Sequence, residues 1–245
     1  MTPVWACAKR GTLGREFRRD LPANKKTVSF MAWQETMQLT WTGANILLLA
    51  QNHNPSIVSP GWLREHELVD EAPENFVHTP AFSLFQSQTY QLLVDQQRLQ
   101  FSLRVLNEAN LQRLQAALVR YLQILPHIPY SAIGLNFTWT ALAERRGEGF
   151  DLTEHLFLSE DGRAWQKRLF GEVRVGSMLY NFTKTYRLRL LIEPQLTQDG
   201  NLTLDFNYHF DLGEPGKGTA AVNQLPECYK DSEQISRLLL KPETS

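Results

Sequence analysis

The sequence predicts an α+β protein with a largely antiparallel sheet of six to eight strands, one long helix and shorter helices packed on one face. Residues 202–211 alternate apolar and polar side chains, and residues 185–192 do nearly the same. Because a strand directs successive side chains to opposite faces of a sheet, each segment is typical of a strand with one buried and one wet face. The polar turn at 198–201 predicts an antiparallel hairpin. Strands also cluster along the chain, which favours α+β over a doubly wound parallel sheet.

The first half of the chain predicts strands followed by the long helix. Residues 37–50 begin with alternation and end in an apolar stretch, which predicts a long strand. Ser59 followed by Pro60 predicts the start of a short helix, since serine caps free N–H groups and proline suits the first helical position. Residues 76–105 predict further strands, including a hairpin with its turn at 95–98. From the cap Asn107, leucines recur at spacings of three and four as far as residue 125, which predicts the long helix.

The second half predicts a similar order with shorter helices. Residues 131–140 alternate as a strand, and residues 161–170 suit a short helix. Residues 172–180 are expected to form the strand that precedes the hairpin. A final short helix, capped near Asp231 or Ser232, closes the chain.

The predicted elements suggest one α+β domain over residues 31–245. Both halves contain several strands and then a helix, so two similar halves could meet near residues 141–150, where 144–149 reads as a charged, glycine-containing loop. The sequence shows no residue-level repeat that would indicate a duplication.

Charge separates an N-terminal arm from the rest of the chain. Residues 1–30 carry seven basic and two acidic side chains, a net charge of +5, whereas residues 31–245 carry 18 basic and 24 acidic ones, a net charge of −6. The favoured interpretation of the arm is a flexible tail or a mis-assigned start codon upstream of Met31. A transit-like peptide and a nucleic-acid contact are the alternatives, and the acidic body argues against the second.

Composition indicates a soluble protein, with 42% hydrophobic and 21% charged residues. No apolar run is long enough for a membrane helix, and no secretory signal is present, so we expect a cytoplasmic protein that does not contact a membrane. Cys7 and Cys228 lie far apart and suggest neither a disulfide framework nor a zinc site.

Several motifs of catalysis and cofactor binding are absent. The glycine-rich stretch at 213–219 separates Lys217 from Thr219 and lacks the first glycine of a phosphate loop, so it predicts a turn. The six histidines form no metal-binding pair and are expected at the surface or at caps. No serine elbow or catalytic cysteine pattern occurs either. We therefore expect no cofactor and no metal.

One candidate site follows from the hairpin. The polar side of the 202–211 strand aligns Asp205, Asn207, His209 and Asp211, and the partner strand is expected to place Arg187 and Arg189 opposite them. The plainer interpretation is a solvated, charge-paired sheet face. The more specific interpretation is a surface that binds a ligand or partner, with His209 as a possible proton carrier.

Two classes of function remain open. The first is a non-catalytic protein-interaction or binding module that uses this polar sheet face or a free sheet edge to bind a protein partner or a second copy of itself. The second is a cofactor-free enzyme or small-ligand binder, which would need a concave pocket at the same six residues. The lack of clustered nucleophiles, metal ligands or a phosphate loop favours the first, and nucleic-acid contact through the arm ranks third.

Overall fold

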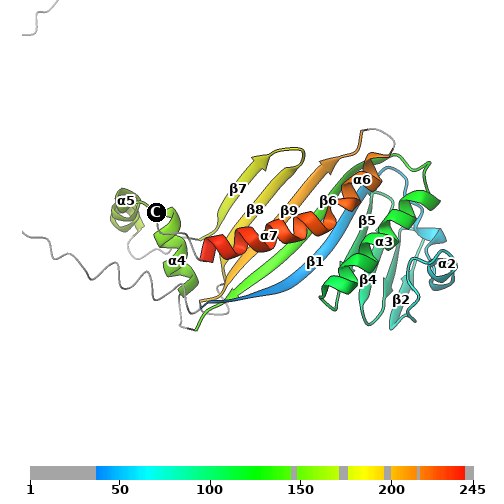
Figure 1. Ribbon diagram of the computed structural model, residues 1–245, viewed down its shortest axis with the longest axis horizontal. Coiled ribbons are helices and arrows are strands. Elements are labelled where there is room, and N and C mark those ends of the chain that lie inside the picture. The colour runs from blue at the N-terminus through cyan, green and yellow to red at the C-terminus, as the bar shows by residue number, and fades with distance from the viewer. Residues whose placement is uncertain (1–36, 145–147, 171–175, 196–199, 214–215, 241–245) are drawn as a thin grey trace, which may run out of the picture.

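The computed structural model describes residues 37–144, 148–170, 176–195, 200–213 and 216–240 of the 245-residue chain. Within these ranges the fold is α+β, with one antiparallel sheet of nine strands, six α-helices and one short 3-10 helix (Figure 1). The predicted class is confirmed, but the expected six to eight strands are too few. The basic arm at 1–30, and residues 198 and 199 of the predicted hairpin turn, lie outside the described residues.

The strands are β1 (Gln38–Ala50), β2 (Asn75–His78), β3 (Phe82–Gln86), β4 (Tyr90–Asp95), β5 (Arg98–Leu103), β6 (Tyr130–Leu142), β7 (Met178–Thr183), β8 (Arg187–Pro194) and β9 (Leu202–Asp211). Their order across the sheet is β2-β3-β4-β5-β1-β6-β9-β8-β7. The strand count exceeds the expectation because two very short strands, β2 and β3, follow each other within twelve residues. Thr79 closes the turn between them: its N–H and its hydroxyl both donate to Phe82 O, at 2.9 and 3.1 Å.

The two longest strands, β1 and β6, lie side by side in the middle of the sheet. In the first half of the chain, β5 pairs with β1 and so connects the outer strands to the middle of the sheet. In the second half, β9 does the same by pairing with β6. Two similar halves within a single domain over residues 31–245 stay a prediction.

The helices in the described ranges are α2 (Pro60–Glu65), α3 (Glu108–Ile124), α4 (Glu148–Phe157), α5 (Glu160–Phe170), α6 (Lys217–Asn223) and α7 (Leu225–Leu240), and η1 (Pro55–Ile57) precedes α2. Both predicted caps of the first half are confirmed. The Ser59 hydroxyl accepts from Trp62 N at 3.2 Å, and the Asn107 side-chain oxygen accepts from Asn110 N at 2.8 Å.

Three helical segments differ from the expectation. Helix α4 begins at Glu148, inside the predicted loop. Gly149 lets the first turn of this helix lie against the backbone just before β9, since a Cβ at this position would lie 2.7 Å from Gly200 O. Helix α6 occupies residues predicted as a turn, and Gly216, with φ of 85°, starts it. Helix α7 starts seven or eight residues earlier than expected, and it tolerates Pro226 because a proline at the second helical position loses only an N–H that the first turn leaves unpaired.

One face of the sheet packs against the helices and forms the core. The predicted leucine stripe of α3 is buried, and Figure 1 shows α3 and α7 lying along the same side of the sheet. Two side-chain hydrogen bonds attach α7 to β6 and β9. Trp139 Nε1 donates to Ser232 Oγ at 2.9 Å, and Tyr208 OH donates to Asp231 Oδ2 at 2.8 Å. The core also holds aromatic side chains, of which Phe137, Trp139, Phe206 and Tyr208 are buried and Trp41, Trp62 and Phe210 are partly buried.

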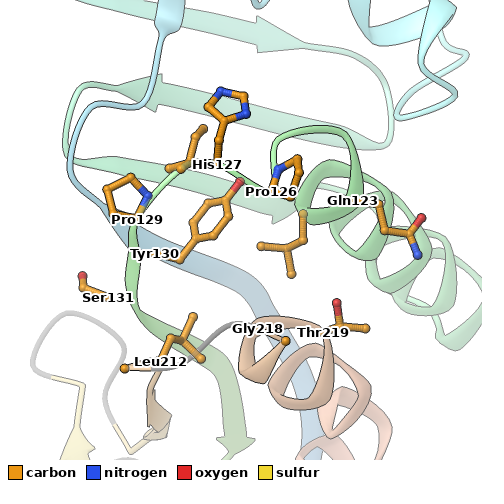
Figure 2. A pocket seen from close by; sticks show the side chains of 13 residues that line it. Gln123, Pro126, His127, Pro129, Tyr130, Ser131, Leu212, Gly218 and Thr219 are labelled. Carbon is orange, nitrogen blue, oxygen red and sulfur yellow. The ribbon is translucent and has the colours of Figure 1, made fainter.

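A cavity of about 720 Å³ lies where the end of α3, the loop before β6 and the segment between β9 and α6 meet (Figure 2). Its wall includes Pro126, Tyr130 and Leu212. The hydroxyl of Tyr130 donates a hydrogen bond to Leu125 O at 3.0 Å. Gly213 and Gly216 complete one side, on either side of residues 214–215, which are outside the described ranges.

No helix in the described part of the chain is long and apolar enough to cross a membrane.

His53 departs from the expectation of exposed histidines. The residue is only 2% exposed: its backbone N–H donates to Gln96 O in the β4–β5 turn at 3.0 Å, and its ring packs against Tyr121 and Tyr130. His53 Nδ1 shares a hydrogen bond of 3.2 Å with Tyr121 OH, and its buried Nε2 has no partner among the described residues. Burial lowers the pKa of His53 below its ordinary 6.5, although the Leu48 carbonyl and Asp95 act in the opposite direction.

The buried His53 predicts that the protein loses stability in mild acid. Because its pKa is lower in the folded state than in the unfolded state, its contribution is full above about pH 6.5 and declines as the pH falls toward the folded-state value. Between about pH 7.5 and about pH 5.5, His53→Gln should therefore lose less unfolding free energy than the natural chain. Urea unfolding measures this, with exposed His127→Gln as the control. Equal pH dependence in the natural chain and His53→Gln would contradict the prediction.

Candidate functional site

The six predicted site residues lie on the sheet face opposite the core. Arg187 and Arg189 come from β8, and Asp205, Asn207, His209 and Asp211 come from β9. Residues of β9 that alternate with them, such as Leu204 and Phe206, are buried on the helix side. The strand register places Arg187 opposite His209 and Arg189 opposite Asn207, as the predicted hairpin requires.

Five of the six residues fall into three contact groups. Arg187 Nη2 donates to Asp211 Oδ1 and Oδ2 at 2.8 and 3.1 Å, and His209 Nε2 lies 3.1 Å from Asp211 Oδ1, so these three residues form one cluster. Asp205 instead accepts from Thr138 Oγ1 on β6 at 2.7 Å. Asn207 donates to Asn136, also on β6. Arg189 is exposed on β8, between Asn207 of β9 and Asn181 of the edge strand β7.

The cluster sits at the surface, and its charges are paired. The hydrogen bond with His209 holds the pKa of the Asp211 carboxyl below its ordinary value, and the positive charge of Arg187 acts in the same direction. Asp211 therefore stays ionised as the anion between two donors. Such an exposed pair contributes little to stability, because water screens it.

Sequence reasoning missed that one row of polar side chains crosses all nine strands on the open face. One register row, named here the polar row, holds only polar side chains, and seven of its nine members are amides. The row runs Asn75, Gln86, Gln91, Ser102, Asn45, Asn136, Asn207, Arg189 and Asn181. The alternation within each strand was a visible signal, but the row itself depends on strand register, which no single segment specifies.

Side-chain hydrogen bonds connect the centre of the polar row. Asn207 Nδ2 donates to Asn136 Oδ1, and Asn136 Nδ2 donates to Asn45 Oδ1 at 2.9 Å. The three amides are half-buried, although no described helix covers this face. The chain of amides links β9 to β6 and β6 to β1, so it joins the two halves of the sheet on the open side.

Beside the polar row, the open face is apolar in its first half. Val77, Leu84 and Leu93 lie opposite one another on β2, β3 and β4, and Leu47 lies in the same register row on β1. Val77 is 38% exposed, and the three leucines are half-buried. The open face thus combines an apolar part, a polar row and, in its second half, the paired charges.

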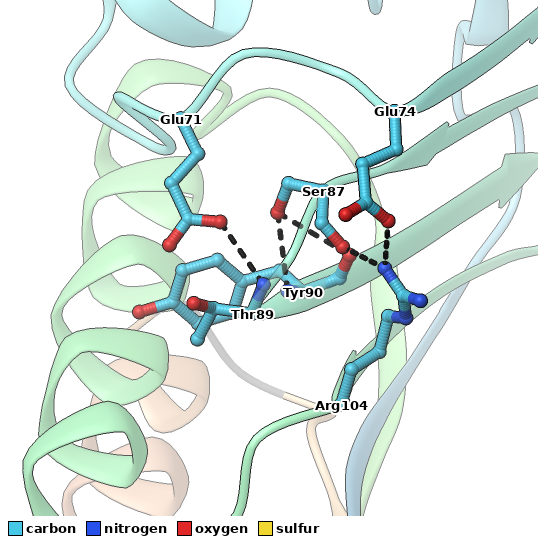
Figure 3. Close-up of polar contacts among 6 residues, drawn as sticks. All are labelled: Glu71, Glu74, Ser87, Thr89, Tyr90 and Arg104. Carbon is cyan, nitrogen blue, oxygen red and sulfur yellow. Dashed lines mark hydrogen bonds and ion pairs between the residues drawn. The ribbon is translucent and has the colours of Figure 1, made fainter.

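A polar network fixes the turn between β3 and β4, where Gln86 and Gln91 of the polar row lie (Figure 3). Glu71 Oε2 accepts from Thr89 N at 3.0 Å. Arg104 Nη1 donates to Ser87 O and to Glu74 Oε2, the second at 2.5 Å. Partial burial would raise the pKa of Glu71, but hydrogen bonds from Ser87 and Thr89 outweigh it and lower the pKa.

The chemistry available to the described residues is limited. The 720 Å³ cavity, and a second of about 430 Å³ beside α3, are lined by none of the six predicted residues. Among the described residues, no three His, Cys, Asp or Glu side chains are grouped so that they could hold a metal ion. Burial raises the pKa of the Cys228 thiol to about 12, which keeps it protonated and unreactive.

The chain matches no known protein-family model, and no curated protein is significantly similar to it in sequence.

The cluster predicts a specific titration. His209→Ala removes the hydrogen bond that contributes most to lowering the Asp211 pKa, so this pKa should rise toward its ordinary value of 3.8. Carbon-detected NMR of the Asp211 carboxyl measures the change, and Thr203→Ala on the same strand face is the control. An unchanged Asp211 titration in His209→Ala would show that the 3.1 Å contact is not formed in solution.

The amide chain predicts a loss of stability from its middle member. Asn136→Ala removes the hydrogen bonds to Asn45 and Asn207 and a longer one to Gly134 O, and it leaves the two amides without their shared partner, which should cost about 1–2 kcal/mol of unfolding free energy. Gln91→Ala, at the same row but outside the chain of bonds, should cost less than about 0.5 kcal/mol. Denaturant unfolding compares the two, and equal losses would contradict a structural role for the amide chain.

Proposed function

We propose that this chain is a non-catalytic binding module that uses the open face of its sheet, or a free edge of that sheet, to bind a protein. The observation that carries this proposal is the combination of the polar row and the adjacent apolar stretch of Val77, Leu84 and Leu93 on a face that no described helix covers. A protein partner or a second copy is favoured over a small molecule.

The composition of the face supports a protein ligand. Protein interfaces combine apolar area with polar groups that can pair across the contact, and a contiguous exposed apolar patch on an otherwise polar surface is a common mark of an interaction site. Amide side chains suit such a contact, because each offers donors and an acceptor without the desolvation cost of a charge. A sheet face of nine strands also offers a broad surface, whereas a small molecule needs a hollow that encloses it.

A second candidate is a cofactor-free enzyme or small-ligand binder at Arg187, His209 and Asp211. The observation that favours it is the direct contact of an imidazole and a guanidinium with one carboxylate. Against it stand the exposure of the cluster and the absence of its three residues from the walls of both described cavities. Nucleic-acid contact through the basic arm ranks third, on the net charge of residues 1–30 alone.

Native mass spectrometry of the full chain, purified gently from its own host, tests the proposal. We expect a co-purifying protein or a homo-oligomer. The double variant Gln91→Lys with Gln100→Lys places two unpaired charges on the open face and should weaken a partner bound there at least about tenfold. Gln112→Lys on the exposed side of α3 is the matched control and should have no effect.

Three other results would contradict the module. A retained small-molecule mass that disappears in Asp211→Ala would favour the ligand-binding candidate. Steeply salt-dependent nucleic-acid binding that is lost on removal of residues 1–30 would favour the arm. A partner that Gln112→Lys removes and the double variant leaves bound would place the contact on the helix side.

A further inference from the structure

We propose that the protein binds a second copy of itself through the outer edge of β7, so that two nine-stranded sheets join antiparallel across a two-fold axis. This inference rests on the proposed binding function and specifies one partner and one edge.

The edge strand β7 carries none of the features that usually protect a sheet edge. It is the outermost strand of the sheet, and no other described strand pairs with its outer side. Its six residues, Met178–Thr183, contain no charge, no proline and no glycine, and its register with β8 is regular over all six pairs. Natural edges are usually interrupted by charges, prolines or bulges, because free N–H and C=O groups attract another strand.

The opposite edge, β2, differs in each of these respects. It has four residues, and Pro73 and Pro80 lie two residues outside its two ends. Glu74 precedes it, and His78 ends it. The two edges of one sheet therefore differ: β2 is short and bounded by prolines, whereas β7 is longer and unprotected.

Apolar side chains on both faces of β7 are exposed. Leu179 on the open face is 49% exposed, and Phe182 on the helix side is 45% exposed. Phe182 stacks on Tyr180 with ring centroids 6.1 Å apart, and Tyr180 in turn contacts Phe157 of α4 at 5.7 Å. The helix side of the edge is therefore an ordered aromatic row that ends in a half-exposed phenylalanine.

One register suits a second copy better than its neighbours. If Tyr180 lies opposite Tyr180 of the other copy, then Met178 of each copy lies opposite Phe182 of the other. Residues directly opposite in an antiparallel pair share a face, so all six helix-side apolar side chains meet in one cluster. Moving the centre to Asn181 would bring Met178 opposite the charged Lys184, and moving it to Leu179 would bring Phe182 opposite Gly176, where it has no side chain to pack against.

The residues just outside β7 fit the same register. Lys184 follows the strand at one end. In the Tyr180-centred register it lies opposite Gly176 of the other copy, so its charge is not brought against an apolar side chain. At the other end of the strand Ser177 Oγ donates to Glu193 Oε1 at 2.9 Å.

The size of the contact sets its strength. A six-residue strand is about 20 Å long, and its pairing alone buries less than the roughly 800 Å² per partner of a standard stable interface. We therefore expect a reversible dimer with a Kd on the order of 10 µM.

Sedimentation equilibrium of the full chain between about 1 and about 200 µM tests the proposal. We expect a monomer–dimer equilibrium. Phe182→Lys and Leu179→Lys, one on each face of the edge, should each raise the Kd at least about tenfold. Val105→Lys, at a similarly exposed apolar position after β5 in the first half of the chain, is the matched control and should leave the Kd unchanged. Far-ultraviolet circular dichroism and the unfolding midpoint establish that each variant is folded.

Hydrogen exchange gives a second, mutation-free measurement. Backbone amides of residues 178–183 should exchange more slowly as the protein concentration rises, and those of residues 75–78 should not change. A chain that stays monomeric throughout the concentration range would overturn the proposal. So would a dimer that neither Phe182→Lys nor Leu179→Lys weakens.

The failure of this inference is distinguishable from the failure of the proposed function. A strictly monomeric chain whose co-purifying protein is lost in the Gln91→Lys, Gln100→Lys variant overturns the β7 dimer and leaves the open-face module standing. A dimer sensitive to Phe182→Lys, with no other partner and no effect of the open-face variant, supports the β7 contact and removes the open face as a binding site.

Discussion

The antiparallel pairing of β1 with β6 is the interaction on which the rest of the structure depends. The two strands are separated by some ninety residues, yet they pair along almost their whole length and form the middle of the sheet. Gly43 permits the one irregularity near Trp41, since a Cβ at this position would lie 3.1 Å from the Thr138 Cβ. Every other strand is placed outward from this pair. The helices α3 and α7 can cover one continuous core only because β1 and β6 join the strands beneath them.

This central pairing also explains why the two faces of the sheet differ so sharply. Ile46 and Leu135 lie on the helix side with no exposure, while Asn45 and Asn136, their neighbours along the chain, lie on the open side and share a hydrogen bond. A slip of one residue would exchange these faces and bury unpaired amides at a cost of a few kcal/mol each. The hydrogen-bonded amides thus support the same register that the apolar core requires, and the open face is polar as a consequence of how the sheet is aligned.

Local pattern was sufficient for part of this structure. The β8–β9 hairpin and the caps at Ser59 and Asn107 follow from alternation and cap chemistry, which act within a few residues. Helices α4 and α6 were missed because glycine disfavours a helix locally, whereas here Gly149 and Gly218 allow close packing against Gly200 O and Leu122. The placement of Arg187 opposite His209 was predictable from the hairpin. The polar row was not, since it joins nine segments whose mutual register is determined by tertiary packing.

Trp41 and Trp139 come from the two central strands, and their rings stack with centroids 6.3 Å apart. Tyr229 of α7 packs against both, at 4.7 and 5.7 Å. Three chromophores from the first half, the second half and the closing helix therefore share one small volume. Coupled indole transitions of this kind exist only when the two central strands are assembled. The near-ultraviolet circular dichroism of the natural chain should therefore carry an optical signal for the joining of its halves, with no label added.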